Sequence, residues 1–337
     1  MWGVTMRLLQ TCAGGLAMNS ITAEFRKHID NGQLFLGDME NLNVDNFVKL
    51  PHPKKPGEYV GAINHLADDA GARLVVYPHN HTEAIALSKH YYSDKRGCKF
   101  DVMLSPPASI LNTHNKLRLY NSLKDANLPA LQHSETSKEF IFAPTFRDCK
   151  NMIFKPADGC GGAGIIQSAK IEENYVCCEV LHGQEYTVDA LAFRGDLIDH
   201  CTRLREKSHG GICVRATIEG SKAITNVIKK LIAYFGLHGP LAIQGFMTHE
   251  GFFITDVNHR FGGGVGMSIL AGWKGIENYI LISKGKRPIT DYKVKSITVR
   301  RWYKEEVVSE NSISDRIEGR VGRGDLARVE SSVSARA

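Results

Sequence analysis

The chain has 337 residues, enough for about two domains, and 43% of them are hydrophobic while 23% are charged. This composition is typical of globular proteins and excludes disordered, fibrous and collagen-like chains. No stretch reaches the roughly 18 consecutive apolar residues of a membrane-spanning helix, and a net charge of +6 without basic runs argues against nucleic-acid binding. We therefore expect neither a membrane nor a nucleic acid as partner.

The first 112 residues alternate short strands with helices. We expect strands at 7–10, 34–37, 73–77 and 101–104, and helices at 16–29, 58–70 and 81–90. This order predicts a small α/β domain, 1–112, with a parallel sheet and helices on its faces. Ligands of such sheets bind at the carboxyl ends of the strands, which points to Gly14, Gly15 and the turn at 78–81. A purely structural role for these turns is an equal alternative.

A different pattern follows in residues 113–310, which we expect to form a second domain. We predict an amphipathic helix at 114–127, strands over most of 152–205, helices at 221–235 and 266–284, a hairpin of 241–247 with 252–258, and a last strand at 296–303. Residues 130–180 and 181–310 would be its two lobes. No internal repeat is present.

The last segment, 311–337, lacks periodicity and contains Ile-Glu-Gly-Arg at 317–320, typical of a vector-encoded protease site. We expect this tail to be disordered or vector-derived. The eight cysteines form no CxxC pair or zinc-like cluster, and are expected to be buried thiols in a reducing compartment. Residues 1–20 are not typical of a secretory signal, so the sequence favours the cytoplasm.

Residues 159–164 read Gly-Cys-Gly-Gly-Ala-Gly, a literal GxGxxG after an apolar run. A dinucleotide-binding fold would need a helix after this loop, but the β-branched pair at 165–166 predicts a second strand. Gly161, Gly162 and Gly164 would let backbone N–H groups approach a phosphate, and Lys155 would place its ammonium on the same phosphates. A dinucleotide-dependent oxidoreductase and a plain flexible turn are the less favoured alternatives.

A polar strand lies at 256–260. Alternation places Asp256, Asn258 and Arg260 on one face. Oxygens of Asp and Asn suit Mg²⁺, and an arginine can meet a phosphoryl group; Gln244 on the preceding strand would add an oxygen. A solvated polar face is the alternative, but the apolar residues at 252–254 indicate a buried strand, in which an unpaired Asp is costly.

Two weaker candidate regions lie between these elements. Residues 178–189 would offer backbone groups to a purine, with Glu179 or Glu185 accepting hydrogen bonds from a ribose; a plain hairpin is equally compatible. A basic stretch around the glycines at 210–211 would hold a carboxylate substrate through Arg205 and Arg215, with Arg203, Lys207 and His209 beside them. A solvated strand edge is the alternative there.

These elements, in this order, resemble the ATP-grasp superfamily over residues 5–306. The matching stretches are IFKPADGCGGAGI, CEVLHGQEYTVDAL and AIQGF…FFITDVNHRFGGG, with SPPASILNTHNKLRLYNSLKDANLP resembling the family's join between domains. The closest similarity is to the carbamoyl-phosphate synthetase large-subunit and biotin carboxylase branch and its free-standing ligases. The fold this implies is a small parallel-sheet domain before a two-lobed α+β ATP-grasp domain.

The resemblance also implies roles for the matching residues. ATP would be bound at its phosphates by Lys116 and Lys155, under the lid by Gly161, Gly162 and Gly164, at the adenine by Glu179, Val180 and Leu181, and at the ribose by Glu185. Mg²⁺, or alternatively Mn²⁺, would be held by Gln244, Asp256 and Asn258. Arg260 would stabilise the transferring phosphoryl group, with Lys155 as the second catalytic residue.

The family usually has Glu in place of Asp256, and often Glu in place of Gln244, which puts the binding of two metal ions in doubt. The reaction this implies is carboxylate activation by ATP as an acyl phosphate, followed by attack of an amine or other nucleophile. The partners would be these small molecules, and a homodimer stays open. A non-catalytic, ATP-binding regulatory protein of the same fold is the alternative.

Overall fold

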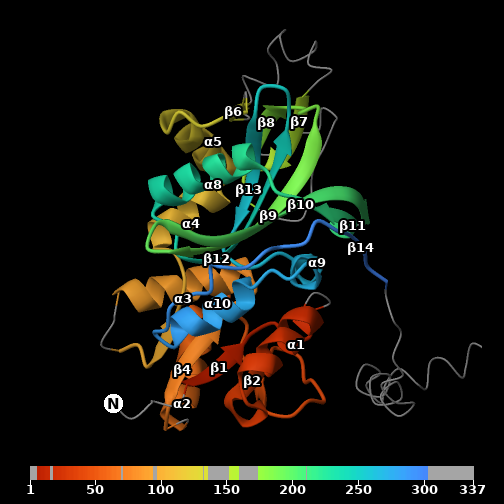
Figure 1. Ribbon diagram of the computed structural model, residues 1–337. Coiled ribbons are helices and arrows are strands. Elements are labelled where there is room, and N and C mark those ends of the chain that lie inside the picture. Colours follow the sequence, from red (N-terminus) through yellow and green to blue (C-terminus); the bar gives the residue numbers. More distant parts are fainter. Residues whose placement is uncertain are drawn as a thin grey trace, which may run out of the picture. The chain divides into compact units, whose positions relative to one another are not determined.

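The computed structural model describes residues 6–15, 18–69, 71–93, 97–131, 133–135, 152–158, 174–209 and 211–302. Gly161, Gly162 and Gly164 of the predicted lid and the tail 311–337 lie outside these residues. The chain divides into a unit of residues 1–300 and a C-terminal unit, 301–337, and the first unit is described below (Figure 1). The domain boundaries that the sequence suggests within 1–310 stay a prediction.

Five parallel strands form the first sheet, in the order β3-β2-β1-β4-β5 (Figure 1). They are β1 (Met6–Gln10), β2 (Leu34–Asp38), β3 (Phe47–Lys49), β4 (Arg73–Tyr77) and β5 (Phe100–Val102). The helices between them are α1 (Met18–His28), α2 (Pro56–Asp69) and α3 (His81–Ser93), with a short 3-10 helix, η1 (Asn31–Gln33). Apolar residues cover both faces of the sheet: Leu8 packs in the core that contains α1, and Leu9 in the core that contains α2. The predicted parallel sheet is confirmed; β3 was not predicted.

Two helices, not one, connect this sheet to the rest. They are α4 (Pro107–His114) and α5 (Lys116–Asp125), separated at Asn115, whose side chain accepts a hydrogen bond from the backbone N–H of Arg118 (3.1 Å). The helix expected at 114–127 therefore begins two residues later than predicted, at Lys116, and α4 was not predicted. Its start at Pro107 is physically permissible, because proline fits the first turn of a helix, where no N–H is needed.

Two antiparallel sheets follow. The smaller has the order β6-β8-β7, with β6 (His133–Glu135), β7 (Met152–Pro156) and β8 (Tyr175–Glu179). The larger has the order β13-β12-β9-β10-β11-β14, with β9 (Gln184–Phe193), β10 (Asp196–His209), β11 (Ile212–Ile218), β12 (Gly239–Met247), β13 (Phe252–Asn258) and β14 (Thr298–Arg300). Helix α8 (Lys222–Phe235) covers one face of the larger sheet, where its Ile228 shares a core with Val188 of β9 and Ile243 of β12.

Helices α9 (Val265–Leu270) and α10 (Gly275–Ser283) replace the single helix expected at 266–284. The chain breaks at Gly272, whose φ of +91° is unfavourable for other residues. Helix α10 contacts both α1 and β9. Its Tyr279 donates a hydrogen bond to the carbonyl oxygen of Val76 in β4 (3.3 Å) and shares a core with Phe25 of α1 and Leu191 of β9. The first sheet and the six-stranded sheet therefore have a common core.

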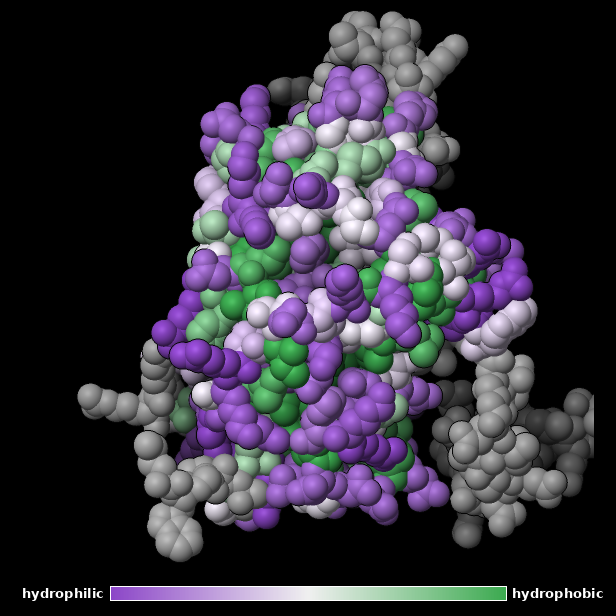
Figure 2. All heavy atoms as spheres, viewed as in Figure 1, coloured by the Kyte–Doolittle hydropathy of each residue, from purple (hydrophilic) through white to green (hydrophobic). Residues whose placement is uncertain are grey.

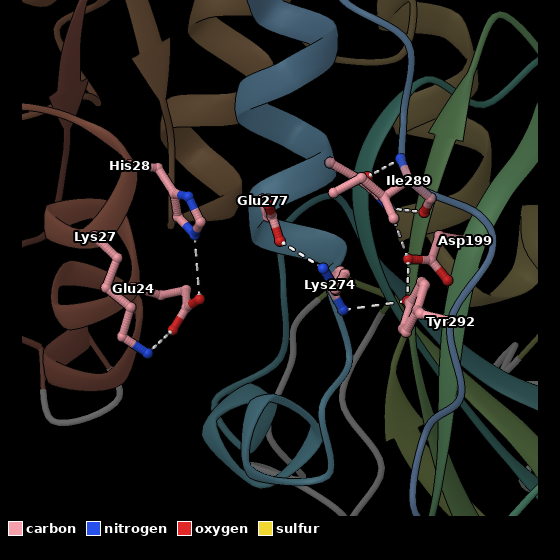
Figure 3. A network of polar contacts seen from close by, with 9 residues as sticks. Glu24, Lys27, His28, Asp199, Lys274, Glu277, Ile289 and Tyr292 are labelled. Carbon is pink, nitrogen blue, oxygen red and sulfur yellow. Dashed lines mark hydrogen bonds and ion pairs between the residues drawn. The ribbon is translucent and has the colours of Figure 1, made fainter.

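A polar network fixes the irregular segment that follows α10 (Figure 3). The carboxylate of Asp199, in β10, accepts hydrogen bonds from Asn278 Nδ2 (3.0 Å) and from the hydroxyl of Tyr292 (2.5 Å). Asn278 Nδ2 also donates to the carbonyl oxygen of Ile289, and Asn278 Oδ1 accepts from its backbone N–H. Burial raises the pKa of Asp199, while the two donors lower it. The network ties α10, β10 and the segment together and so directs the chain toward β14.

The described surface is largely polar in the view of Figure 2, where hydrophilic residues surround small apolar areas. Within the described ranges, every helix is too short or too polar to cross a bilayer.

Gly239, at the start of β12, lies against the chain that leaves β5. Its φ is +94°, and a Cβ atom there would overlap the carbonyl oxygen of Met103, just after β5. We expect Gly239→Ala to lower the free energy of unfolding by roughly 2–4 kcal/mol, since backbone strain and overlap add. Gly236→Ala is the control, because its φ is also positive (+58°) but its Cβ would meet open space; about 1 kcal/mol is expected. Equal losses in urea titrations of the two variants would contradict this.

Candidate functional site

The face of the six-stranded sheet opposite α8 brings the predicted metal-binding residues together. Strand register places Gln244 of β12 between Thr187 of β9 and Asp256 of β13. In the next row, Ala242 lies between Asp189 and Asn258. Residues of β9 that alternate with these, such as Val188, pack under α8. The part of this second face that carries these two rows is therefore polar, and we call it the polar face. Farther along β9 on the same side, Leu191 packs in the apolar core that contains α10.

Asp256 and Asn258 are buried and bound to one another: Asn258 Nδ2 donates to Asp256 Oδ2 (2.9 Å). This bond directs the amide nitrogen to the carboxylate and leaves the amide oxygen, Oδ1, pointing elsewhere. One carboxylate with amide oxygens suits Mg²⁺, which keeps most of its ligands for phosphates and water. Among the described residues, no group of three His, Cys, Asp or Glu is arranged for a metal. A metal ion here would thus depend on phosphate oxygens.

A buried hydroxyl group supports the same assignment. Thr187 is 3% exposed, and its Oγ1 has no hydrogen-bond partner within the described part of the chain. It lies in the row of Gln244 and Asp256, on the polar face. Because an unpaired buried hydroxyl is costly, this position fits a polar ligand such as metal-bound water or phosphate oxygen.

The two lysines predicted to bind phosphates meet at the three-stranded sheet. Lys116 begins α5, and its backbone N–H donates to the carbonyl oxygen of Ala157 (2.8 Å), two residues after Lys155 of β7. Burial raises the pKa of the Cys178 thiol on β8, and the charges of Lys155 and Lys116 both lower it. Both ammonium groups therefore lie near the same thiol. This arrangement creates a positive region at one end of the small sheet.

The predicted adenine-binding residues lie where the chain passes from the small sheet to the large one. Glu179 ends β8, Val180 and Leu181 follow, and Glu185 belongs to β9. Between them, a Cβ atom at Gly183 would overlap the carbonyl oxygen of Met247 in β12. The connection is thus held closely against the large sheet, beside the polar face.

Arg260 follows β13 and lies near a group of imidazoles that the sequence did not connect with it. His81 begins α3 and stacks on His114, which ends α4. Burial lowers the pKa of His81 to about 3, with further lowering by His114, His259, Arg260 and Lys116. Burial likewise lowers the pKa of His114. The charge of Lys116 also lowers this pKa, whereas the charge of Asp256 raises it. The turn after β4, the end of α4 and the end of β13 therefore converge.

Gly14 and Gly15 lie at the carboxyl edge of the first sheet, beside the same turn. The backbone N–H of Gly14 donates to Asp38 Oδ2 (3.0 Å), and that of Gly15 to the carbonyl oxygen of Cys12 (3.0 Å). Nearby, buried Glu83 accepts hydrogen bonds from Thr11 and from the backbone of His79. These contacts stabilise the turns, and none of them involves a residue of the polar face.

The three arginines of the basic stretch each have a carboxylate partner. Arg205 pairs with Glu185 (3.1 Å), and Arg215, which is 47% exposed, pairs with Glu206 (2.6 Å). Arg203, which we expected beside them, is 1% exposed and binds Asp189 through two hydrogen bonds (2.9 and 3.1 Å). The charges of this stretch are thus divided among three different carboxylates.

Sequence reasoning missed the role of Asp189, which also accepts hydrogen bonds from the backbone of Gly262 (3.2 Å) and from Ser268 (2.7 Å). These contacts hold the loop after Arg260 against the large sheet. The signal was present for Asp189, since it lies among apolar residues of β9 and a buried charge needs a partner.

His79 makes stability dependent on pH. Burial, with a smaller effect of Arg260, lowers its pKa to about 3. A depressed histidine pKa gives stability that is present above the unfolded value of about 6.5 and is lost as pH falls. Between pH 7.5 and 5.5 we expect this histidine to lower the free energy of unfolding by about 1 kcal/mol. In urea titrations His79→Gln should reduce the pH dependence by this amount, whereas the exposed His65→Gln should not.

Comparison with known proteins identifies a family that matches part of this chain. Residues 172–305 match the family described as ATP-grasp in the biosynthetic pathway with Ter operon. No curated protein matches the chain. These 134 residues include the whole polar face and the connection between the sheets.

Solved structures share the fold over most of the chain. Carboxyaminoimidazole ribonucleotide synthase from Aspergillus clavatus, complexed with ATP, has a TM-score of 0.65 at 14% identity, over 88% of this chain and 81% of that one. L-amino acid ligase from Bacillus licheniformis has a TM-score of 0.64 at 11% identity, over 88% and 79%. The biotin carboxylase domain of Hydrogenobacter thermophilus 2-oxoglutarate carboxylase, with MgADP and bicarbonate, has a TM-score of 0.62 at 15% identity, over 88% and 73%. At these identities the likeness shows the fold.

Proposed function

Because this chain has the ATP-grasp fold, as the sequence predicted, we propose that it is an ATP- and Mg²⁺-dependent ligase that activates a carboxylate as an acyl phosphate. The main support is the row of Thr187, Gln244 and Asp256 on the polar face of the sheet. Arg260 follows two residues after the end of β13. This donor set suits a magnesium-bound phosphate better than a reacting acid–base pair.

In this proposal, Lys116 and Lys155 bind the phosphates, and Glu179, Val180 and Leu181 contact the adenine. Glu185 accepts hydrogen bonds from the ribose, and Gly161, Gly162 and Gly164 cover the phosphates. Gln244, Asp256 and Asn258 would hold Mg²⁺, which supplies charge neutralisation when bound. Gly14, Gly15 and Arg215 stay predictions for the other substrates.

The reaction has two steps. A carboxylate oxygen forms a bond to the γ-phosphorus, and the bond from that phosphorus to the β–γ bridging oxygen breaks, releasing ADP. The nucleophile, an amine in the commonest case, then bonds to the acyl carbon, phosphate leaves, and the nucleophile loses a proton. The protein's task is to place the reactants and to neutralise charge. In this proposal, Arg260 neutralises the charge of the phosphoryl group.

The names of the similar structures suggest where to search for substrates, since one is an amino acid ligase and another was solved with bicarbonate. We would incubate the full chain with MgATP and a panel of amino acids, other carboxylates and bicarbonate, with and without amines, and measure ADP and phosphate. Release that requires one particular acid is expected. Binding of MgATP without release for any pair would favour the regulatory alternative. Thermal stabilisation by NAD(P)H instead of MgATP would contradict both.

A further inference from the structure

Arg205 and Glu185 are cross-strand neighbours at the end of the β9–β10 ladder. Leu204 pairs with Tyr186, and the next residue on each strand is Arg205 and Glu185. Arg205 Nε lies 3.1 Å from Glu185 Oε2. The arginine side chain is only 8% exposed, whereas that of the glutamate is 32% exposed. The cation is therefore enclosed, and its carboxylate partner is the more accessible group.

Besides this ion pair, whose Nε–Oε2 geometry is not that of a hydrogen bond, the guanidinium of Arg205 has two hydrogen-bond acceptors. Its Nη2 donates to Ser208 Oγ (3.0 Å) and to the carbonyl oxygen of Gly211 (3.0 Å). Because a guanidinium is planar and its donors have fixed directions, these contacts and the ion pair together fix its plane. An enclosed arginine that is bound in this way is poorly placed to receive a substrate carboxylate, which was its role in the sequence-based prediction.

We propose instead that Arg205 is a positioning residue, which holds Glu185 in the orientation that accepts the ribose hydroxyls of the nucleotide. This rests on the proposed function, in which Glu185 contacts the ribose. A glutamate side chain loses considerable rotamer freedom when it binds a ligand. An arginine that fixes one carboxylate oxygen beforehand lowers that cost and leaves the other oxygen for the hydroxyls. Arg205 then determines how strongly the site distinguishes a ribose from a sugar without hydroxyls.

The test compares two nucleotides by isothermal titration calorimetry of the full chain in Mg²⁺. We expect the parent to bind ADP about tenfold or more tightly than 2′,3′-dideoxy-ADP, because hydrogen bonds to charged groups are strong. Arg205→Gln should reduce this ratio at least about threefold, mainly through weaker ADP binding. Glu185→Gln should reduce it further, and the double variant should have the ratio of Glu185→Gln alone, because Arg205 acts through Glu185.

Lys207→Gln is the matched control, since it removes a positive charge from an exposed position of the same strand. It should keep the parent's ratio. If Arg205→Gln does not fold, Arg205→Lys serves in its place; it keeps the charge, loses the fixed plane and should give an intermediate ratio.

Three results would overturn the inference. An unchanged ratio in both Arg205 variants, with a reduced ratio in Glu185→Gln, would show that Arg205 does not position Glu185. A parent that binds ADP and dideoxy-ADP equally would show that Glu185 does not contact the ribose. A parent that binds no MgADP at all would overturn the proposed function itself, and this inference with it.

Discussion

Replacing Asp256 by asparagine should remove most of the effect of Mg²⁺ on nucleotide binding. Asparagine has nearly the same shape and keeps an oxygen that can accept the hydrogen bond of Asn258, so the fold should be retained. The negative charge, which we propose binds Mg²⁺, is lost. We expect the affinity for ADP in Mg²⁺ to fall at least about 10–100-fold. Losing a residue that only supports a metal ligand already has an effect of this size. Calorimetric titration with ADP, with Mg²⁺ and with EDTA, measures this.

The comparison in EDTA is the internal control, because ADP should bind the parent and Asp256→Asn equally without a metal. Asp256→Ala should show the same loss of the Mg²⁺ effect together with a lower stability. Its Asn258 amide would lose a buried acceptor, which costs about 1–3 kcal/mol. If Asp256→Asn responds to Mg²⁺ as the parent does, Asp256 is not a ligand, and the proposed metal position is wrong.

Replacing Asp189 by alanine should have the largest effect on stability. The guanidinium of Arg203, which is 1% exposed, would lose its only charged partner among the described contacts, and the backbone of Gly262 and the hydroxyl of Ser268 would each lose an acceptor. Breaking a buried pair by removing one partner costs about 3–5 kcal/mol. We expect a loss of this size in the free energy of unfolding, measured by urea titration.

The double variant Asp189→Leu with Arg203→Met separates the charge effect from the packing effect. Because it leaves no buried charge, it should lose less than Asp189→Ala alone. The surface pair of Arg215 and Glu206 is the control, and Arg215→Gln should change stability by less than about 1 kcal/mol. A double variant that is less stable than Asp189→Ala would show that the ion pair contributes more than it costs to bury.

Local patterns predicted the elements that have a regular period. Strand β4 has the predicted bounds, because a continuous apolar run followed by Pro78 fits only a buried parallel strand. The paired strands β12 and β13 were predicted because two apolar runs flank a short polar turn at 248–251. Helix α4 was missed because the prolines before it are typical of a turn, and nothing local shows that Ile110 is buried.

The candidate site divides in the same way. The hairpin that brings Gln244 and Asp256 together could be predicted, but their direct pairing could not. The plain register would place Gln244 opposite Thr255, and a bulge next to Gly245 shifts it to Asp256. Arg203 and Arg205 looked alike in sequence, as two cations on one strand, but their partners come from β9. Which carboxylate each meets depends on the register and bulges of a longer hairpin, so composition could not separate a structural pair from a group near the ligand. Arg260 comes near His81 only through long-range packing.

The common core beneath α10 has a consequence for how the molecule unfolds. The rings of Phe25 in α1 and Tyr77 in β4 pack against Tyr279 and Phe261, which come much later in the sequence. A fragment that stops before α10 would expose these rings to water and would tend to aggregate. Residues 6–300 are therefore expected to melt in a single cooperative transition, in which the six-stranded sheet does not unfold separately from the five-stranded sheet.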